Sequence, residues 1–586
     1  MPTTKSITHL LLKHDRDITR QEILAVGKGD VKIELDSTTA NLLAERRRDI
    51  VDFVNAQHLP AYGFNRGFGH NVDLAVDDEH LGQLQENLIL SHCVGVGDPV
   101  PNEIVRMTML LRAQSLARGH SGVRPVLVQH ILNMLNHDIL PIVPQLGSVG
   151  ASGDLAPLSH IALGMLGKGR VVCGGLEMDA GEAFPLARLE PLRLEMKEGL
   201  ALNNGVQYMT AIGLYCTHKM QVYLKTAAMQ TAMTAQVMLA PETPFCSDLH
   251  QLRPHPGAVK VAGWIYKLMS DSPLREAHRD VRIDGEIQDP YNIRCAAQIL
   301  GTCAELIDEC EAALLREANS VTDNPLLLKA DKEYGWDPGD PYYGKIVDIV
   351  SGGHFHGMPV AVRIYNLFQA MGMMASLLNR RCARYVDSNA NKGLGRDLKW
   401  PSLSDAEKAV SSGMMMLEYT SAALANSIWG DCMPNHLFNI STNTGQEDHV
   451  SMGTDIALRL LKSLPKLSNL LAIELAFISQ AAAIRKHLPH IPSQIMPPEN
   501  VAEKINVLND EIQKMKTPFE MDIQVREHYP LKPEQRLLNP ICEQTLQRVS
   551  GIFPPVIHDR ELSGEILKLA GYIESGEMIE LCESSD

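Results

Sequence analysis

The sequence predicts a mainly α-helical protein in which a bundle of long helices follows a smaller N-terminal domain of mixed structure. Between residues 201 and 486 most segments are long, rich in Ala, Leu and Met, and carry apolar residues at helical spacing. This region shows neither an alternation of strands with helices nor an internal repeat of fixed period. A chain of 586 residues also exceeds the size of one ordinary core. We therefore expect three domains, residues 1–200, 201–486 and 487–586, with the bundle in the second.

The composition argues against several classes of function. The chain has 54 Lys and Arg against 70 Asp and Glu, a net charge of −16, and no basic cluster, so neither nucleic acid nor an anionic membrane is expected as a partner. Residues 1–13 show no signal-peptide pattern. The eleven cysteines form no CxxC pair, which predicts free thiols in a reducing cytoplasm, without disulfides or a zinc site.

The N-terminal domain is expected to combine helices with loops. Residues 1–34 are poorly periodic, and the glycine-rich residues 167–192 predict loops with a small strand pair. The predicted helices of this domain cover residues 37–55, 81–94, 104–118 and 126–139.

The second domain carries the longest helical patterns. The most apolar stretch, residues 470–484, includes Glu474, Ser479 and Gln480, so we expect a buried helix rather than a membrane span. Prolines break the pattern after His487. Examples of the predicted bundle helices are residues 209–240, 295–317, 360–384 and 406–428.

Residues 147–160, GSVGASGDLAPLSH, form a small, flexible stretch with unusual chemical potential. Gly153 has no Cβ, so its amide nitrogen can approach the carbonyl carbon of Ala151. Ring closure, followed by loss of the Ser152 hydroxyl as water, would leave a methylidene-imidazolone (MIO), an electrophile made from the chain itself. Asp154 could assist by hydrogen bonding. Taken alone, Ala-Ser-Gly is a common tripeptide, and a Gly/Ser loop before a helix is usually a turn.

All fourteen residues closely resemble the signature of the MIO-dependent aromatic amino acid ammonia-lyases and aminomutases. Further motifs extend the resemblance from about residue 35 to residue 485. The resemblance implies the long-helix fold of the ammonia-lyase and fumarase type. It also implies an MIO group formed from Ala151, Ser152 and Gly153 with no external cofactor. Members of the family are homotetramers in which three chains share each active site, so we expect the same assembly here.

Tyr62 is the expected catalytic acid/base. Residues 61–70 contain three glycines and three aromatic residues, which is typical of a functional loop, although an aromatic turn packed on the core has the same composition. The loop resembles the family's YGxNxGFG segment, and the resemblance gives its tyrosine the role of acid/base. A phenol with a reference pKa of about 10 needs help to act as a base near neutral pH.

Two further motifs supply groups for the substrate carboxylate. Asn204 matches a family asparagine that contacts the MIO group or this carboxylate, although it could simply initiate a helix. Residues 288–295, QDPYNIRC, match the family's QDPYxxRC, so Gln288 and Tyr291 join the expected site. Arg294 suits a carboxylate because its planar guanidinium binds both oxygens, and a surface arginine at a helix start is the alternative. Tyr291 and Arg294 would share one face of a helical turn.

Two residues indicate a polar substrate ring: His92 favours imidazole or phenol over phenyl, and Glu447 favours imidazole. His92, in a Leu-Ser-His pattern, resembles the residue that the histidine branch places against the substrate ring; a buried core histidine is the alternative. Residues 446–452, QEDHVSM, resemble the histidine branch closely, and relatives acting on phenylalanine or tyrosine generally lack the glutamate. Glu447 would hold the ring N–H or act as an acid/base, unless it is a buried helix-capping acid.

The remaining segments match with departures. Residues 351–361 resemble SGGNFHGEPVA, with Phe355 in the place of a substrate-lining phenylalanine, but His354 and Met358 replace Asn and Glu and put the fine substrate preference in doubt. His354, His356 and His449 do not have a recognisable metal-ligand spacing, and Met415 would line the ring pocket. Residues 490–545 are an insertion relative to short bacterial relatives. Residues 559–562 resemble the family's DRxL segment.

These observations predict an enzyme that eliminates ammonia from L-histidine to give trans-urocanate. A tyrosine or phenylalanine ammonia-lyase and an aromatic amino acid 2,3-aminomutase are the alternatives on the same scaffold. A protein without enzymatic activity that uses the same helical scaffold for assembly is a further alternative. The intact Ala-Ser-Gly, Tyr62, Arg294 and Glu447 argue against it.

Overall fold

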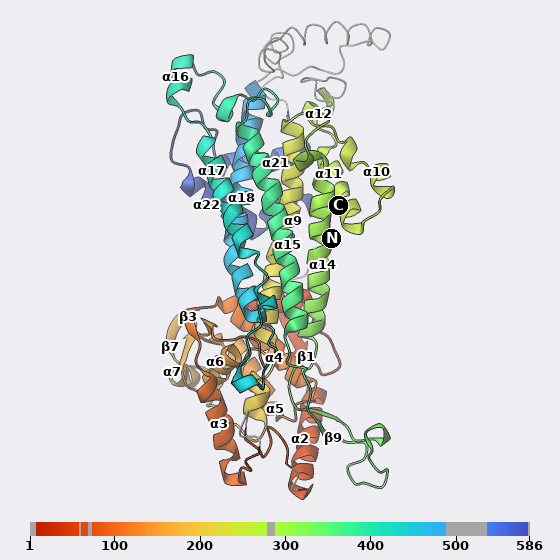
Figure 1. Cartoon of the computed structure of the whole chain (residues 1–586). Coiled ribbons are helices and arrows are strands. Elements are labelled where there is room, and N and C mark those ends of the chain that lie inside the picture. Colours follow the sequence, from red (N-terminus) through yellow and green to blue (C-terminus); the bar gives the residue numbers. More distant parts are fainter. Residues whose placement is uncertain (1–6, 58–59, 68–72, 278–287, 488–535, 584–586) are drawn as a thin grey trace.

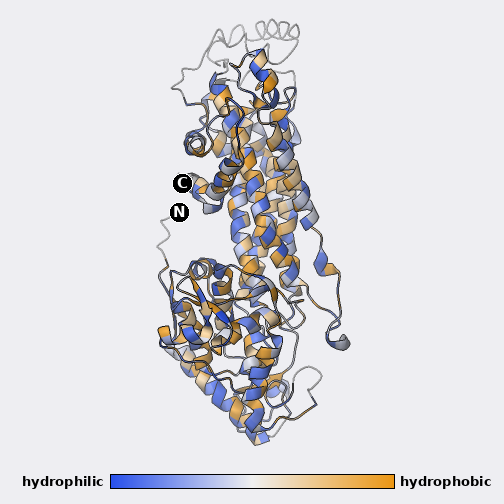
Figure 2. Ribbon diagram, turned by 90° about the vertical axis from the view of Figure 1, so that its left-hand side faces the viewer, coloured by the Kyte–Doolittle hydropathy of each residue, from blue (hydrophilic) through white to orange (hydrophobic). Residues whose placement is uncertain are grey.

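The chain forms an elongated molecule in which a mixed N-terminal part adjoins one end of a long-helix bundle (Figure 1). The computed structural model describes residues 7–57, 60–67, 73–277, 288–487 and 536–583. The mainly helical fold predicted from the sequence is confirmed. Apolar residues recur along the whole length of the bundle helices (Figure 2), so the core of the bundle is continuous from end to end.

The N-terminal part contains helices and four short pairs or groups of strands. β1 and β2 pair in parallel, β3 pairs with β5, β4–β6–β7 form an antiparallel sheet, and β8–β9 is a later hairpin that packs here. The bounds are β1 (His9–Leu12), α1 (Arg20–Lys28), β2 (Lys32–Leu35), α2 (Ser37–Gln57), α3 (Leu81–His92), β3 (Val96–Pro99), α4 (Asn102–Ala117), α5 (Pro125–Asn136), β4 (Ile139–Pro141), β5 (Pro144–Leu146), α6 (Leu155–Met165), β6 (Arg170–Cys173), β7 (Leu176–Asp179), α7 (Ala180–Leu186), α8 (Glu198–Asn203), β8 (Leu326–Lys329) and β9 (Ile346–Val350).

Five long helices make the bundle: α9 (Gln207–Val237), α14 (Ala296–Ala318), α15 (Met358–Val386), α17 (Met415–Asp431) and α18 (Gly453–His487). The shorter helices around it are α10 (Ser247–Gln251), α11 (Pro256–Met269), α12 (Pro273–Ala277), α13 (Tyr291–Arg294), α16 (Asp405–Val410), α21 (Pro540–Ile552), α22 (Ser563–Ser575) and α23 (Glu577–Glu583). Single 3₁₀ turns lie at Asp78–His80, Thr243–Phe245, Lys332–Tyr334, Arg396–Leu398, Asn435–Leu437 and Asn443–Gly445.

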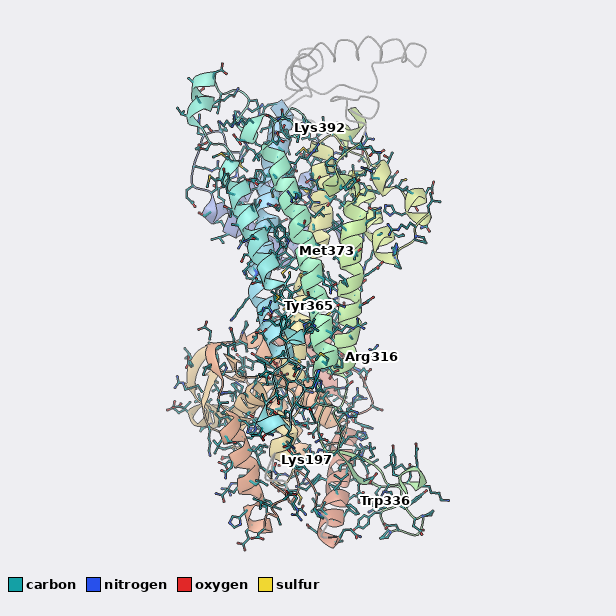
Figure 3. The ribbon with its side chains drawn as sticks, in the orientation of Figure 1. Lys197, Arg316, Trp336, Tyr365, Met373 and Lys392 are labelled. Carbon is teal, nitrogen blue, oxygen red and sulfur yellow. The ribbon has the colours of Figure 1, made fainter. Side chains whose placement is uncertain are left out.

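The direction of each long helix decides which residues can meet. Arg316, near the C-terminus of α14, lies where the bundle adjoins the N-terminal part, whereas Lys392, after α15, lies at the opposite end (Figure 3). We call these the near end and the far end of the bundle. α9, α15 and α18 begin at the near end, and α14 runs from the far end back to it (Figure 1).

In three segments of the N-terminal part the structure adds to or changes the elements expected from the sequence. The segment 1–34 contains β1, α1 and β2, elements of only four to nine residues, too short for a periodic signal. Residues 167–192 form the strand pair β6–β7, as expected, but also helix α7. Ile139, predicted as a helix end, lies in β4 because it pairs with Cys173.

The predicted helix 406–428 is divided into α16 and α17 by residues 411–414. Gly413 has φ +58°, and the backbone N–H groups of Ser412 and Gly413 donate to the Asp559 carboxylate at 2.6 and 3.1 Å. The carboxylate therefore takes donors that a continuous helix would use internally.

Helix α18 is long and apolar enough to cross a membrane by length and composition, but 89% of its most apolar window is buried inside the protein. The predicted buried helix at residues 470–484 is confirmed as part of it. Glu474 on this helix is ion-paired with Arg381 of α15, and both side chains are fully buried. Arg381 Nη2 donates to Glu474 Oε2 at 2.9 Å, and its Nη1 donates to Thr231 of α9 at 2.7 Å. The pair thus joins three bundle helices.

Replacing Glu474 by Ala should lower the free energy of unfolding by about 3–5 kcal/mol, because it leaves the Arg381 guanidinium buried without a counter-charge. Denaturant unfolding at fixed protein concentration measures the loss. Replacing both partners by apolar residues, Arg381→Met with Glu474→Leu, should cost much less. A loss below about 1 kcal/mol for Glu474→Ala, the range of an exposed ion pair, would contradict this account.

Candidate active site

The loop from Gly147 to Asp154 connects β5 to α6 and is held by the segment that leads into α18. Met452 N donates to Val149 O at 2.9 Å, and Ser451 Oγ donates to Gly150 O at 3.1 Å. Gly150 has φ +66°, and a Cβ there would lie 2.1 Å from Ser451 Oγ. The loop therefore has its backbone fixed by residues about 300 positions further along the chain.

Gly153 lies against Gly205 at the junction of α8 and α9. It has φ +80°, and an ideal Cβ would lie only 2.2 Å from Gly205 O. The backbone N–H of the next residue, Asp154, donates to the same oxygen at 2.6 Å. Only glycine can occupy this position, because any side chain would collide with backbone that cannot move aside. The Ala151–Gly153 tripeptide is therefore confined from the side of Gly205.

Ser152, Asn204 and Glu447 meet within one chain. Ser152 Oγ donates to Glu447 Oε1 at 3.1 Å, and Asn204 Nδ2 donates to Ser152 O at 2.9 Å. The second Glu447 oxygen accepts from Thr442 Oγ1 at 2.7 Å. Asn204 Oδ1 is buried and has no hydrogen-bond partner among the described residues. A buried acceptor of this kind needs a partner, which a substrate ammonium or amide group could supply.

Asp154 anchors the loop to two bundle helices. Its carboxylate is fully buried and accepts from Met209 N at 2.9 Å and from Thr454 Oγ1 at 2.7 Å. Burial raises the pKa of Asp154 to about 6, and these hydrogen bonds oppose the rise. Asp154 precedes α6 but makes no cap bond with its side chain, so its role is to hold the reactive loop to the first turns of α9 and α18.

Tyr62 lies on a loop that is fixed against α8. Gln85 Nε2 donates to Gly63 O at 3.2 Å, and Gln85 Oε1 accepts from Gly199 N at 2.9 Å. Ala61 and Phe64, on either side of Tyr62, are buried in a small core with α2 and the β8–β9 hairpin. Tyr62 lines a cavity of about 810 Å³ together with residues of that hairpin. Residues 68–70 of the predicted motif lie outside the described residues.

His92 is the last residue of α3 and is half-buried. Its Nδ1 lies 2.8 Å from Leu88 O, so Nδ1 carries the proton and donates, and Nε2 is left as an acceptor. The following strand β3 pairs with β5, which leads directly into the reactive loop. His92 is thereby held near the loop with one ring nitrogen able to accept a hydrogen bond.

Phe355 precedes α15 on a segment that lies beside residues 446–453. His356 Nε2 donates to His449 O at 3.0 Å, and a Cβ on Gly357 would lie 2.8 Å from Ser451 Oγ. Phe355, which is partly buried, therefore belongs to the near end of the bundle with Ser152. In the described part of the chain no group of three His, Cys, Asp or Glu side chains could hold a metal ion.

The structure does not bring the other predicted residues to Ser152 of the same chain. Gln288, Tyr291 and Arg294 precede α14, whose 23 residues span about 35 Å from the far end to the near end. Asn292 of the same turn contacts the Arg380 carbonyl, close to the far end of α15. Met415 begins α17 next to the Asp397 region, also toward the far end.

Tyr291 and Arg294 share a face, as predicted, with the guanidinium 4.9 Å from the ring centroid. Tyr291 is 68% exposed, and Arg294 is half-buried. Both side chains are therefore available to another molecule. The predicted site residues of one chain thus fall into two groups at opposite ends of its bundle: Ser152, Asn204 and Glu447 at the near end, and Gln288, Tyr291, Arg294 and Met415 at the far end.

Sequence reasoning missed four buried polar residues around α8: Gln85, Arg112, Lys197 and Asp323. Gln85 joins the Tyr62 loop to α8, and the other three surround its two ends. A weak signal existed, because Lys197 precedes the segment of Asn204 by only a few residues and Asp323 follows the predicted helix 295–317 closely.

Comparisons with known proteins agree with the fold and show the family. The model of the aromatic amino acid lyase family matches residues 18–505. The histidine ammonia-lyase of Deinococcus radiodurans is 38% identical over 466 residues, 80% of this chain and 84% of that protein. Among solved structures, the histidine ammonia-lyase of Trypanosoma cruzi (28% identity, TM-score 0.78) covers 98% of this chain and 95% of its own. The phenylalanine aminomutase of Pantoea agglomerans (25% identity, TM-score 0.81) covers 97% and 99%. The chain belongs to the aromatic amino acid lyase family and is a carbon–nitrogen lyase.

Proposed function

We propose that this protein eliminates ammonia from L-histidine to give trans-urocanate, using an MIO group formed from Ala151, Ser152 and Gly153. The observation that carries the proposal is the contact of Ser152 with both Glu447 and Asn204. Incubation with L-histidine, L-tyrosine and L-phenylalanine in turn, followed by ultraviolet absorbance of the conjugated product, tests it. Turnover of L-phenylalanine or L-tyrosine without L-histidine would contradict the substrate.

The surroundings fit an internal ring. Ring formation joins Gly153 N to the Ala151 carbonyl carbon, and the carbonyl oxygen leaves as water with one proton from each of the Gly153 and Ser152 amides. The Ser152 hydroxyl leaves as a second water with the Ser152 Hα. Gly153 lies in close contact with Gly205 O, so the loop has little room to move. Beside it, the buried Asn204 Oδ1 has no hydrogen-bond partner in the described chain and can accept one.

The residues divide the chemical work. The β-proton of an amino acid is weakly acidic and its amine is a poor leaving group; the MIO electrophile would capture the amine nitrogen and make it easier to expel. Tyr62 removes the β-proton, Arg294 binds both carboxylate oxygens, and Asn204, Gln288 and Tyr291 support this orientation. Phe355 and Met415 line the ring pocket. Orientation of this kind can contribute about 7–11 kcal/mol at best.

His92 and Glu447 select the imidazole ring. The acceptor nitrogen of His92 can take a hydrogen bond from one N–H of an imidazolium ring, and the Glu447 carboxylate can take one from the second N–H. A neutral imidazole has a single N–H and donates to one of the two. The resemblance of residues 446–452 to the histidine branch and the named activity of the relatives support this choice over the phenyl or phenol ring.

Replacing His92 by Phe should lower kcat/KM for L-histidine by at least about 30-fold, about 2 kcal/mol, because one polar partner of the ring is lost. The thermal unfolding temperature should change little, since His92 is half-buried and Phe keeps an apolar body. Steady-state kinetics and a melting curve measure the two effects. A kcat/KM within a few-fold of wild type would make His92 structural.

A homotetramer with shared active sites explains why the site residues are divided between the two ends. A stripe of exposed apolar side chains follows α17 and the next segment, which is unusual for a surface that faces water. It consists of Met416, Tyr419, Trp429, Met433, Leu437, Phe438 and Ile440. Packing of a second copy there would bury the stripe and bring a far end to a near end.

An aminomutase remains the second candidate, because the P. agglomerans aminomutase shares the fold and re-addition of ammonia at the β-carbon needs the same elimination. Product analysis for a β-amino acid distinguishes the two. We place the enzyme in the cytoplasm, since the ten cysteines whose side chains the structure describes have free thiols. We expect no external cofactor, metal, nucleic acid or membrane partner.

A further inference from the structure

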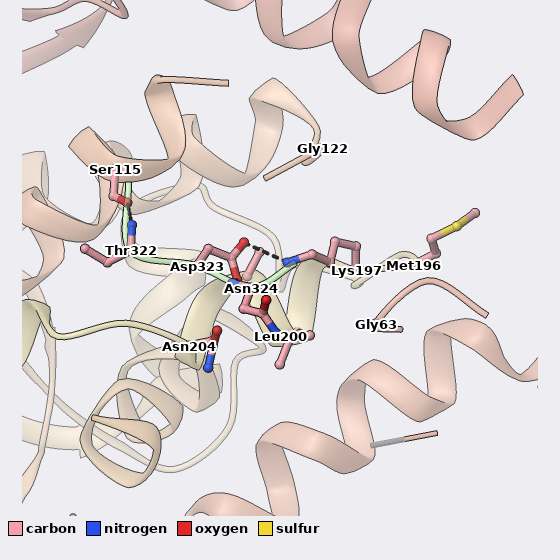
Figure 4. A network of polar contacts seen from close by, with 12 residues as sticks. Gly63, Ser115, Gly122, Met196, Lys197, Leu200, Asn204, Thr322, Asp323 and Asn324 are labelled. Atoms are coloured by element: carbon pink, nitrogen blue, oxygen red, sulfur yellow. Dashed lines mark hydrogen bonds and ion pairs between the residues drawn. The ribbon is translucent and has the colours of Figure 1, made fainter. Parts of the chain in front are cut away.

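Besides Glu198, whose carboxylate is paired with Arg124, three charged side chains are buried around α8 and lie outside the groups assigned above; Figure 4 shows two of the three, Lys197 and Asp323. They are Arg112 of α4, Lys197 before α8 and Asp323 after α14, and each is at most 2% exposed. We call them the buried charge cluster. It holds two cations and one anion, although burial of an unbalanced charge costs several kcal/mol. Stability alone is a poor explanation for such a group.

The cluster makes polar contacts at both ends of α8. At the N-terminal end, Lys197 Nζ donates to Asp323 Oδ2 at 2.7 Å. At the C-terminal end, Arg112 Nη1 donates to Asn204 O at 3.1 Å, and Nη2 donates to Ala201 O. Burial lowers the pKa of Lys197, and Asp323 opposes the effect; burial also lowers the pKa of Arg112 to about 10, again opposed by Asp323. Asp323 is thus the counter-charge of both cations.

Helix α8 depends on contacts with other segments to stay helical and in place. It has six residues, and an isolated helix of that length is unstable in water. Lys197 before it has the left-handed φ of 73°, a conformation that a non-glycine residue adopts only when its surroundings impose it. The place of its last residues, and hence of the Asn204 side chain on Ser152 O, depends on the groups that hold its ends.

The Gly205 peptide transmits this position to the reactive loop. A Cβ on Gly205 would lie 2.4 Å from Arg112 Nη1 and 2.7 Å from Thr322 Oγ1. On its other side, Gly205 O touches Gly153 and accepts the Asp154 N–H. No space is left between the cluster, Gly205 and Gly153, so a shift of Arg112 would shift the confinement of the tripeptide.

We propose that the buried charge cluster is a positioning device that seats the Asn204–Gly205 peptide against Ser152 and Gly153, and that closure of the Ala151–Gly153 ring depends on it. This inference rests on the proposed function, since it presupposes that the ring forms. Arg112, Lys197 and Asp323 touch neither substrate nor reacting atoms; they act through α8.

The test compares two buried ion pairs. Lys197→Met with Asp323→Leu removes the pair beside α8, and Arg381→Met with Glu474→Leu removes the fully buried pair in the bundle as a matched control. After cell-free synthesis, intact mass is sampled over time to give the fraction of chains that have lost two waters. Melting curves and light scattering report folding and assembly.

Wild type and the bundle control should lose two waters at the same rate. The Lys197→Met/Asp323→Leu chain should do so about 100-fold more slowly, the cost of a misplacement of about 1 Å. It should still fold and assemble, although it melts below wild type because the buried Arg112 loses its counter-charge. Equal rates in all three folded proteins would overturn the inference. An unmodified mass in active wild type would overturn the proposed function instead.

A single conservative substitution tests the same inference if the double variant does not fold. Arg112→Lys keeps the buried charge but cannot bridge the carbonyls of Asn204 and Ala201 together with the Gln207 side chain. Its ring should also form at least about tenfold more slowly, a change of about 1.4 kcal/mol in the barrier. Ring formation by Arg112→Lys at the wild-type rate would overturn the inference by itself.

Discussion

The Ser152→Ala protein should fold and assemble like wild type, lose at least about a thousandfold in kcat/KM, and keep the full mass of its translated sequence. A thousandfold loss corresponds to about 4 kcal/mol of barrier. The reason is chemical: the methylidene carbon can come only from the Ser152 side chain, and Ala has no hydroxyl to leave. The Ser152 side chain makes one hydrogen bond within the described residues, the 3.1 Å bond to Glu447, so the change removes little that stabilises the fold.

Intact mass spectrometry under denaturing conditions, kinetics and a melting curve measure the three parts of this result. Wild type should be lighter than its sequence by two waters, and borohydride should inactivate it by reducing the electrophile. Thr442→Val is a matched control, because it removes a different contact of Glu447 and leaves the tripeptide unchanged; its chain should still lose two waters. Active wild type with the unmodified mass would rule out the internal ring.

The residues of the near end could be predicted because their motifs are local. Ser152, Asn204 and Glu447 each stand in a short segment with a distinctive sequence, and the structure brings all three together. Their mutual geometry is still a product of the fold, since 295 positions separate Ser152 from Glu447. The long bundle helices could be predicted equally well, because an apolar pattern of helical period over more than twenty residues is compatible with few structures other than a helix.

The missed features depend on contacts between distant segments. The break before α17 is made by Asp559, about 146 residues away, and no local sequence signal encodes it. The buried charge cluster combines α4, the start of α8 and the turn after α14, and each residue alone resembles an ordinary surface charge. Helix α1 is different: its capping box of Thr19 and Glu22 and its Gly29 end are visible in the sequence, but its nine residues give too little periodicity.

Two inactive variants should restore activity to each other when their subunits exchange, provided that they damage opposite ends of the bundle. Glu447→Gln damages the near end, where Glu447 contacts Ser152 of the same chain. Arg294→Met damages the far end, which α14 separates from Ser152 by about 35 Å. If the far end of one chain completes the near end of another, a one-to-one mixture gives about a quarter of the sites both wild-type groups.

The measurement is the initial rate of L-histidine elimination after mixing, with subunit exchange demonstrated by native mass spectrometry of differently tagged chains. The matched control mixes Glu447→Gln with Ser152→Ala, two changes at the same near end. One chain supplies both groups to a site, so no hybrid of these two variants contains an intact pair, and activity should stay at the level of the parents. Recovery in the control mixture, or none in the test mixture despite full exchange, would refute a site shared between subunits. A monomer by light scattering would do the same, because in one chain Arg294 and Ser152 lie at opposite ends of the bundle.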